Sequence, residues 1–310
     1  MICWVLAGFF TVWAIVRTGG LERGYPLVQL IAYTPYILML SLLALLFVVL
    51  CRRWLAAGFL GLAVLALTLA VLPRAIGGPE SVPGARPVRI LTFNLAKSKA
   101  DTQAVVDEAE ARQADLVFLQ ELTRKKAEEL NQAGFSASYP HQATRFSEKF
   151  GNAIWSRWPL VRRDPLATKE QPRADVEVPD SIPIEVVSVH PTAPIHRSDM
   201  KLWERDYRYL PTAFSADIPI VLAGDFNATL DHDNLRDLIG TGYRDAAEVL
   251  GDGLVPTWPS KIEFPPPVTI DHVLAEKGIS VSEYDVVQLP GSDHKAVFAE
   301  ILLPPVPGES

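Results

Sequence analysis

The first quarter of the chain consists of long apolar runs separated by short polar turns. Residues 1–16, 27–50 and 54–72 contain no charged side chain. A helix needs roughly 20 mostly apolar residues to cross a bilayer, so the second and third runs have the length of membrane spans. The first run is short and lacks the basic start of a signal peptide, so it is a short span or part of one that begins upstream. We therefore predict three transmembrane helices, with Pro35 bending the second.

The basic residues between these runs give a divided signal about orientation. Arg52 and Arg53 form the turn between the second and third runs, which favours a cytoplasmic position for that turn. Everything after residue 72 would then lie outside the cell membrane. Arg17, Arg23 and Arg74 lie on the opposite side and argue the other way. We expect an extracytoplasmic domain on the basis of the Arg52–Arg53 turn.

A linker and an alternating pattern follow the apolar runs. Residues 73–87 contain four Pro and three Gly, as expected for a linker that lifts a domain off the bilayer. Residues 88–303 then alternate apolar runs of strand length with amphipathic runs of helix length, which predicts an α/β domain. The expected strands include residues 88–95, 115–121, 184–189, 218–223 and 268–274. Residues 304–310 read as a disordered tail.

Charge and cysteine content limit the chemistry of this domain. Residues 86–310 hold 24 basic and 34 acidic residues, a formal charge of −10, which argues mildly against nonspecific nucleic-acid binding. Both cysteines, Cys3 and Cys51, precede the domain, so the domain has no disulfide, no cysteine metal ligand and no thiol nucleophile.

Polar residues recur on or beside the apolar strands, mostly where the strands end. Each one alone is explained by a turn, an ion pair or a satisfied core histidine. Together they indicate one shared site, because the ends of neighbouring strands converge in space. The candidates are Asn94, Glu121, His190, Asp225, Asn227, Asp271, Asp293 and His294.

The donor types in this set favour hydrolysis of a phosphate ester. Carboxylate and amide oxygens suit Mg²⁺, Mn²⁺ or Ca²⁺, whereas zinc is less favoured because few histidines and no cysteines are present. The sequence contains neither a Gly-x-x-x-x-Gly-Lys phosphate loop nor a Gly-x-Ser-x-Gly elbow. A hard cation flanked by carboxylates and imidazoles can neutralise phosphate charge and activate water.

The order of these motifs strongly resembles that of the endonuclease/exonuclease/phosphatase superfamily. The matching segments are Thr-Phe-Asn-Leu at 92–95, Gln-Glu at 120–121, His190, Gly-Asp-Phe-Asn-Ala at 224–228, Ile-Asp-His at 270–272 and Ser-Asp-His at 292–294. The resemblance implies the fold of DNase I, a four-layer α/β sandwich with two packed mixed sheets between outer helices. It spans nearly all of residues 88–303.

The resemblance also implies a metal site. Glu121 would be the main ligand of Mg²⁺ or Mn²⁺, and Asn94 and Asp293 would bind or support the ion.

The remaining motif residues would act on the substrate. Asp225 would activate the attacking water, and Asn227 would position the water or the phosphate. His190 and His294 would bracket the scissile phosphate, and Asp271 would orient a protonated His294.

Other residues receive weaker expectations. Glu148 is a weak candidate for orienting His190, and His272 is expected to pack beside the site or support it. Trp258 lies in a segment that resembles a loop beside the family's site, and we expect it to pack rather than line the pocket. Three histidines match no motif and are expected at the surface: His141, His196 and His232.

The superfamily acts on DNA, RNA, inositol phosphates and phospholipids, so the fold leaves the substrate open. An apolar anchor on this domain resembles a bacterial subgroup associated with teicoplanin resistance. That subgroup implies a lipid-linked substrate such as a polyprenyl pyrophosphate at the outer face of the membrane. A tethered surface nuclease is the alternative, and an inactive binding module is a third reading.

Overall fold

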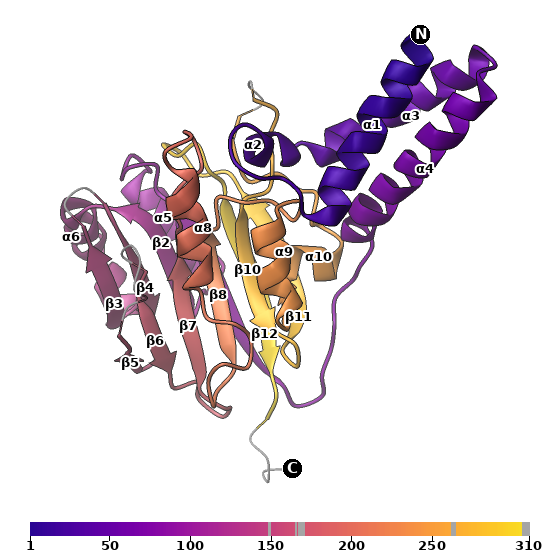
Figure 1. The fold of residues 1–310 in the computed structure, drawn as a ribbon. Coiled ribbons are helices and arrows are strands. Elements are labelled where there is room, and N and C mark those ends of the chain that lie inside the picture. The colour runs from indigo at the N-terminus through magenta and orange to yellow at the C-terminus, as the bar shows by residue number, and fades with distance from the viewer. Residues whose placement is uncertain (148–149, 165, 167–170, 262–264, 306–310) are drawn as a thin grey trace.

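Two six-stranded sheets pack face to face and carry helices on their outer faces, giving four layers (Figure 1). The computed structural model describes residues 1–310 except 148–149, 165, 167–170, 262–264 and 306–310. The predicted α/β sandwich is therefore confirmed. Both sheets contain parallel and antiparallel neighbours, as expected for mixed sheets.

The first sheet has the order β11-β12-β1-β2-β4-β3. Its strands are β1 (Arg86–Asn94), β2 (Leu116–Leu122), β3 (His141–Phe146), β4 (Gly151–Ser156), β11 (Ser280–Val287) and β12 (Ala296–Leu303). β1 and β2 run parallel, and Asn94 pairs with Gln120 at their carboxyl ends. β12 is antiparallel to β1, so its first residues lie at this same edge.

The second sheet has the order β5-β6-β7-β8-β10-β9. Its strands are β5 (Leu160–Arg162), β6 (Arg173–Val176), β7 (Ile184–Val189), β8 (Ile220–Asp225), β9 (Tyr243–Asp245) and β10 (Asp271–Glu276). β7 and β8 are parallel, whereas β10 is antiparallel to β8, with Asp271 opposite Asp225.

Helices cover the outer faces of both sheets. They are α5 (Thr102–Ala111), α6 (Arg124–Gln132), α7 (Phe135–Ser138), α8 (Met200–Arg208) and α9 (Asp233–Gly240). The short helix α10 (Ala246–Leu250) instead packs against the core between the two sheets. Asp101 and Thr123 cap α5 and α6 by accepting backbone N–H bonds, which fixes where these helices begin. Buried aliphatic residues from both sheets fill the space between them.

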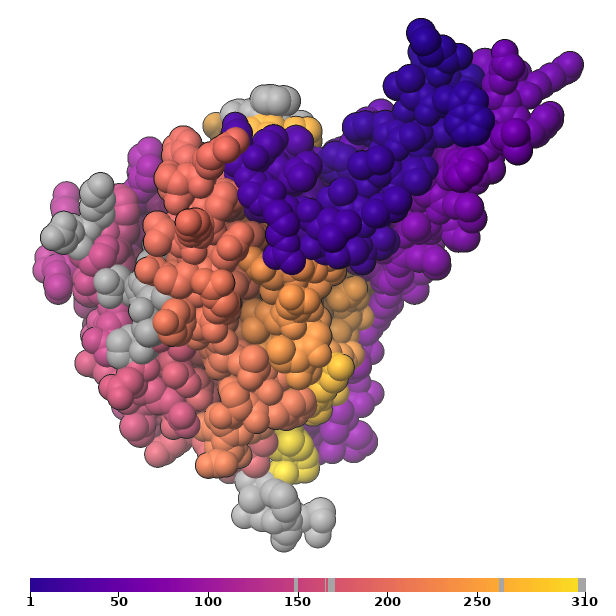
Figure 2. Space-filling view, viewed as in Figure 1, coloured from indigo at the N-terminus to yellow at the C-terminus, as the bar shows by residue number. Residues whose placement is uncertain are grey.

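The apolar N-terminal part forms four helices and a short 3₁₀ turn. They are α1 (Ile2–Gly19), α2 (Leu27–Ile31), α3 (Thr34–Leu50), α4 (Trp54–Val71) and η1 (Leu72–Ala75). We call α1, α3 and α4 the helix bundle. Small residues such as Ala7, Ala44 and Ala63 lie at its centre and let the helices approach closely. The bundle projects away from the sandwich, as Figure 2 shows in indigo and purple.

Of the three predicted spans, the second is shorter than predicted. Two helical segments, Ile2–Gly19 and Trp54–Ala75, are long and apolar enough to cross a membrane, but Thr34–Leu50 is shorter. The run at 27–50 does not form one bent helix, because the chain breaks between Ile31 and Thr34, just before Pro35. The separated piece α2 packs on the sandwich, where Val28 joins the core under α8 and α9.

A buried ion-pair cluster joins the helix bundle to the sandwich. Asp231 is fully buried, and its carboxylate accepts hydrogen bonds from Arg17 Nε (2.6 Å) and from Arg74 Nη1 and Nη2 (2.9 and 2.7 Å). Both guanidinium groups also donate to the Leu230 carbonyl. Burial alone would raise the pKa of Asp231, but the two arginines hold it below its usual value.

Residues 73–87 do not simply extend away from the domain as a linker would. Arg74 is buried in the cluster just described, and Glu80 forms an ion pair with Arg244 (2.7 Å). The Glu80 carboxylate also accepts the Val281 N–H. This segment therefore runs along the sandwich before β1 begins. At the other end of the chain, Pro304 and Pro305 contact Ser181, so this part of the expected tail is ordered.

We predict that Asp231→Ala destabilises the protein by about 3–5 kcal/mol, because it leaves two buried arginines without their carboxylate. Thermal and denaturant unfolding of the detergent-solubilised full chain measures this loss. Asp237 is exposed on α9 and serves as the control, since its replacement by alanine is expected to change stability by less than about 0.5 kcal/mol. Equal stability of the two variants would contradict the prediction.

Candidate active site

The predicted site residues gather at one edge of the sandwich, which we call the polar edge. β1, β2, β7 and β8 end there, and β10 and β12 begin there. This topology brings the ends of strands from both sheets to one edge. The residues at or beside these strand ends are Asn94, Glu121, His190, Asp225, Asn227, Asp271, Asp293 and His294. The expectation that separate strand ends form one shared site agrees with this placement.

Asp225 occupies the centre of the group. Its Oδ2 atom accepts a hydrogen bond from Asn94 Nδ2 (2.9 Å) across the two sheets. His190 Nε2 and His294 Nε2 lie 3.7 Å and 3.8 Å from the same oxygen. These separations are longer than direct hydrogen bonds, and they show that both imidazoles approach the same carboxylate oxygen.

Backbone geometry at the end of β8 and in the turn after it explains the glycine and the asparagine of the Gly-Asp-Phe-Asn-Ala segment. A Cβ atom on Gly224 would lie 2.0 Å from the Val189 carbonyl oxygen, so only glycine fits beside β7. Asn227 has a φ of 49°, a left-handed conformation that asparagine adopts more readily than most residues. Its N–H donates to Asp225 Oδ1 (2.8 Å) and its side-chain amide donates to the Pro191 carbonyl (3.1 Å). Asn227 thus ties the β7 and β8 loops together.

His294 and Asp271 form a buried pair. His294 Nδ1 lies 3.0 Å from Asp271 Oδ2 and 3.2 Å from Oδ1. Burial alone would lower the pKa of His294, but Asp271 and then Asp225 outweigh this effect and raise the pKa to about 10. The imidazole is therefore a cation near neutral pH, with Nδ1–H donated to Asp271 and Nε2–H directed at the centre of the site.

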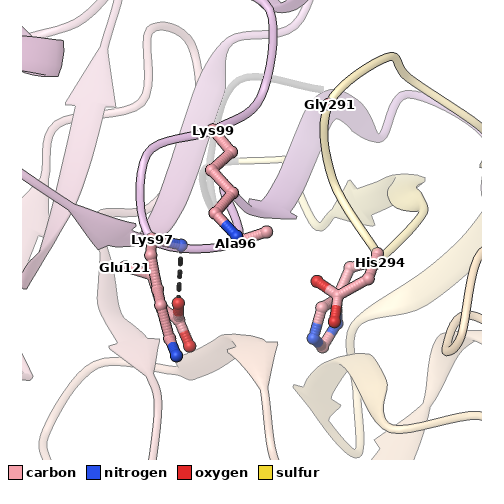
Figure 3. A pocket seen from close by; sticks show the side chains of 7 residues that line it. Ala96, Lys97, Lys99, Glu121, Gly291 and His294 are labelled. Atoms are coloured by element: carbon pink, nitrogen blue, oxygen red, sulfur yellow. Dashed lines mark hydrogen bonds between the residues drawn. The ribbon is translucent and has the colours of Figure 1, made fainter.

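Glu121 lies on the opposite side of the site from His294. Its φ of 54° is unusual for a glutamate and marks local backbone strain. Its Oε2 accepts the Lys97 N–H (2.6 Å), and its Oε1 lies 3.9 Å from His190 Nε2. A cleft of about 310 Å³ separates the two sides, with Ala96, Lys97, Lys99 and Glu121 on one wall and Gly291 and His294 on the other (Figure 3). Asp293 also lines this cleft.

Two groups of oxygen donors at the polar edge have to be compared as metal sites. Asp225, Asp271 and His294 have donor atoms within 4.8 Å of one another. A protonated His294 that donates to Asp271 is not available as a ligand, since metals bind the neutral imidazole. The second group offers carboxylate and amide oxygens without this conflict: Glu121, Asn94 and Asp293. The Asn94 amide is oriented by its Oδ1 atom, which accepts the Ala96 N–H, so that its Nδ2 atom reaches Asp225.

His272 supports the site from behind. It is fully buried, with Nε2 3.0 Å from the Ala228 carbonyl and Nδ1 2.7 Å from Asp245 Oδ2. Burial opposes protonation, but Asp245 outweighs it, so the pKa of His272 is raised. The imidazole therefore links the turn after β8 to β9, in agreement with the expected supporting role.

The expectation of three surface histidines is wrong for His232. This residue is buried, its Nε2 donates to the Val28 carbonyl (2.8 Å), and its Nδ1 accepts the Thr229 N–H (2.8 Å). Burial is the main reason that its pKa falls to about 4, so it is neutral and holds α2 against the polar edge. His196 is exposed and His141 is half-buried on β3. Glu148 lies outside the described residues.

Trp258 contributes more to the site than the expected packing role. Its Nε1–H donates to Asp293 Oδ2 (3.2 Å), and its ring lies 6.4 Å from the His294 ring. Lys97 and Lys99, which were not expected at the site, are exposed on the wall of the cleft. Both lysines follow the Thr-Phe-Asn-Leu segment directly, and residues that follow the end of a strand lie at the same edge of the sheet. Their place at the site could therefore have been predicted from the sequence.

Comparison with known proteins agrees with this geometry. A sequence profile of the Endonuclease/Exonuclease/phosphatase family matches residues 91–294, which is most of the sandwich. The chain belongs to this family. Members are hydrolases that act on phosphodiesters or phosphate esters, and they generally depend on a divalent metal ion. None of the curated proteins matches the chain.

Solved structures show the same fold at low sequence identity. An endonuclease/exonuclease/phosphatase from Beutenbergia cavernae is 20% identical, with a TM-score of 0.54 over 70% of this chain and 72% of that one. An AP endonuclease from Archaeoglobus fulgidus is 16% identical, with a TM-score of 0.55 over 68% and 98%. D. rerio TDP2 humanised by 14 mutations is 16% identical, with a TM-score of 0.54 over 69% and 98%.

The His294–Asp271 pair generates a pH prediction for the metal-free protein. The raised pKa means that His294 favours the folded state fully below pH 6.5 and that this contribution is lost as the pH rises towards about 10. NMR titration of the His294 ring in chelator-treated protein should show protonation up to about pH 10. Asp271→Asn removes the largest of the charges that raise the pKa of His294 and should move the midpoint down from about 10 towards the ordinary value, while Asp225 still favours the charged imidazole. An unchanged midpoint in the variant would refute the assignment.

Proposed function

We propose that this chain is a membrane-anchored, metal-dependent phosphoesterase. It hydrolyses a phosphate ester or pyrophosphate on a lipid-linked substrate such as a polyprenyl pyrophosphate. The observation that carries this proposal is that three loops of the polar edge all contact the apolar N-terminal region. The active site therefore lies on the side of the sandwich from which the helix bundle projects (Figure 1).

Each of the three contacts involves a loop next to a candidate catalytic residue. The loop that follows His190 accepts a hydrogen bond from Gln29 through the Pro194 carbonyl. The loop that follows Asp225 holds Asp231 and its two arginines. The loop that precedes β10 accepts a hydrogen bond from Tyr36 through the Pro267 carbonyl (2.8 Å).

The surface of the helix bundle supports membrane insertion. The helices α3 and α4 are apolar on all sides, which is typical of helices enclosed by protein or lipid. Much of this surface is not covered by protein: Leu55, Leu62 and Leu69 of α4 are 76%, 67% and 67% exposed. Contiguous apolar surface of this kind is costly in water and is stabilised by a bilayer.

The structure weakens the charge argument against an outward-facing domain. Arg17 and Arg74 are buried against Asp231, and Arg23 lies 3.7 Å from Asp233. Arg52 and Arg53 remain exposed at the far end of the bundle. We therefore assign the Arg52–Arg53 turn to the cytoplasm and the sandwich to the outer side.

The side of the membrane is tested by labelling intact cells with an impermeant maleimide. In a chain whose Cys3 and Cys51 are replaced by serine, a cysteine at the exposed Lys201 should be labelled before lysis, and a cysteine at Arg52 only after lysis. The opposite pattern would place the sandwich in the cytoplasm.

Glu121, Asn94 and Asp293 would hold Mg²⁺ or Mn²⁺, because their oxygens are the donors that these ions prefer. The ion would neutralise charge on the phosphate oxygens. Asp225 accepts a proton from the attacking water while the water oxygen bonds to phosphorus and the bond to the leaving oxygen breaks. His294 donates a hydrogen bond from Nε2 to the phosphate, whose negative charge increases in the transition state. Asp271 keeps His294 protonated, and His190 faces the phosphate from the other side.

A surface-tethered nuclease is the alternative. It is favoured by the names of the structural neighbours, which include an AP endonuclease and a TDP2 complexed with single-strand DNA product. The acidic charge of the sandwich and the position of the polar edge beside the helix bundle both favour a lipid over a nucleic acid.

The substrate is tested with the full chain in liposomes that contain Mg²⁺. We expect hydrolysis of polyprenyl pyrophosphate and little or no cleavage of plasmid DNA. Turnover of DNA without turnover of the lipid would overturn the proposed substrate.

The same assay tests the active-site assignment. Glu121→Ala should lower turnover by at least about 100-fold, a typical cost of losing a group that stabilises transition-state charge. Glu128→Ala, at an exposed position on α6, is the matched control and should retain wild-type turnover. Full activity in Glu121→Ala would mean that the site lies elsewhere.

A further inference from the structure

A second cavity, of about 220 Å³, lies between α3 and the loop that precedes β10. We call it the apolar groove. Its apolar lining includes three residues of α3 and three of the loop: Pro35, Tyr36, Met39, Leu254, Pro256 and Val268. It is separate from the catalytic cleft, with which it shares no lining residue.

The polar residues that border the apolar groove are already bonded to other protein groups. Arg74 and Asp231 pair with each other. Thr269 Oγ1 donates to the Val255 carbonyl (2.7 Å), and Thr229 Oγ1 accepts the Asp231 N–H (3.2 Å). A ligand in the groove would therefore contact mainly apolar side chains, and the charged groups among the described lining residues are already paired. An apolar ligand suits such a surface, since it makes no demand on buried polar groups.

One end of the apolar groove lies beside the active site. Val268 exchanges backbone hydrogen bonds with Trp258, at 2.6 Å and 2.9 Å. Trp258 in turn donates to Asp293 and faces His294. Trp258 thus contacts a lining residue of the groove through its backbone and two lining residues of the catalytic cleft through its side chain.

The other end of the apolar groove faces the lipid side of α3. Met39 is 65% exposed there and continues into the exposed apolar surface formed by Leu40 and Leu43. A chain that leaves the groove at this end would pass directly onto a surface that we assign to the bilayer.

We infer that the apolar groove binds the first part of the hydrocarbon chain of the lipid-linked substrate, next to its phosphate. This inference rests on the proposed function and adds a specificity site to it. The groove is smaller than the roughly 300–1,000 Å³ that encloses a drug-sized ligand, so it holds a segment of the chain and leaves the rest in the bilayer. Isoprenoid and acyl chains share the required chemistry.

The test compares long-chain and short-chain substrates with the full protein in liposomes. The isoprenoid pair is polyprenyl pyrophosphate and dimethylallyl pyrophosphate, whose single isoprene unit leaves much of the groove empty. The acyl pair is a long-chain diacylglycerol pyrophosphate and its diacetyl analogue. The readout is the ratio of kcat/KM for the long chain to kcat/KM for the short chain. A general loss of folded protein lowers both values and leaves this ratio unchanged.

Leu254→Glu places a charge in the apolar groove and should lower the ratio by about tenfold, which corresponds to losing the burial of roughly two methylene groups. Met39→Trp fills the groove from the other wall and should lower the ratio in the same direction. Leu202→Glu is the matched control, because Leu202 on α8 is 41% exposed, Leu254 is 39% exposed, and Leu202 does not line the groove.

The outcomes separate this inference from the proposed function. A lower ratio in both groove variants, in at least one substrate series, supports the groove, and the affected series identifies the chain. If both variants keep the wild-type ratio, the groove does not bind the hydrocarbon chain, and the proposed lipid phosphoesterase function is unaffected. If the wild-type protein hydrolyses neither lipid series, the proposed function fails, and the inference falls with it before any variant is compared.

Discussion

The structure depends on one buried carboxylate that accepts two arginines from the N-terminal region. Asp231 follows the Gly-Asp-Phe-Asn-Ala segment by three residues. Arg17 reaches it from the end of α1, and Arg74 reaches it from η1, directly after α4. Removing three charged groups from water is costly, and the cost is offset only when all three partners are in place. The helix bundle and the active-site loop therefore have one mutual arrangement, in contrast to a domain on a flexible tether.

That arrangement has consequences for the chemistry. The loops that contact the N-terminal helices also carry His190, Asp225 and Asp271 or lead directly to them. Asp225 lies between two histidines, whose Nε2 atoms both approach its Oδ2, while Asp271 keeps His294 charged. A catalytic centre built from loops is positioned more tightly when those loops are held on both sides. Here the sheets hold one side and the helices hold the other.

Much of the sandwich and its site could be predicted from the sequence, because strand periodicity and motif order are local signals. The polar ends of the strands, such as Asn94 and Asp225, were predicted in this way. What could not be predicted depends on contacts distant in sequence. His232 is buried because α2 covers it, and Arg74 is buried because it pairs with Asp231. Neither contact can be inferred from the neighbouring residues in the sequence. The break before Pro35 likewise reflects the docking of α2 on the sandwich, which no hydropathy pattern records.

The central claim is that the polar edge faces the bilayer, and quenching by lipids with nitroxide headgroups tests it without any assumption about substrate. In a chain without native cysteines, one fluorophore is attached at Ile195, in the exposed loop after His190, and another at Lys277, beyond the opposite end of β10. The account predicts strong quenching of the label at position 195 in liposomes and little quenching at 277. Equal quenching at both positions, or stronger quenching at 277, would contradict it.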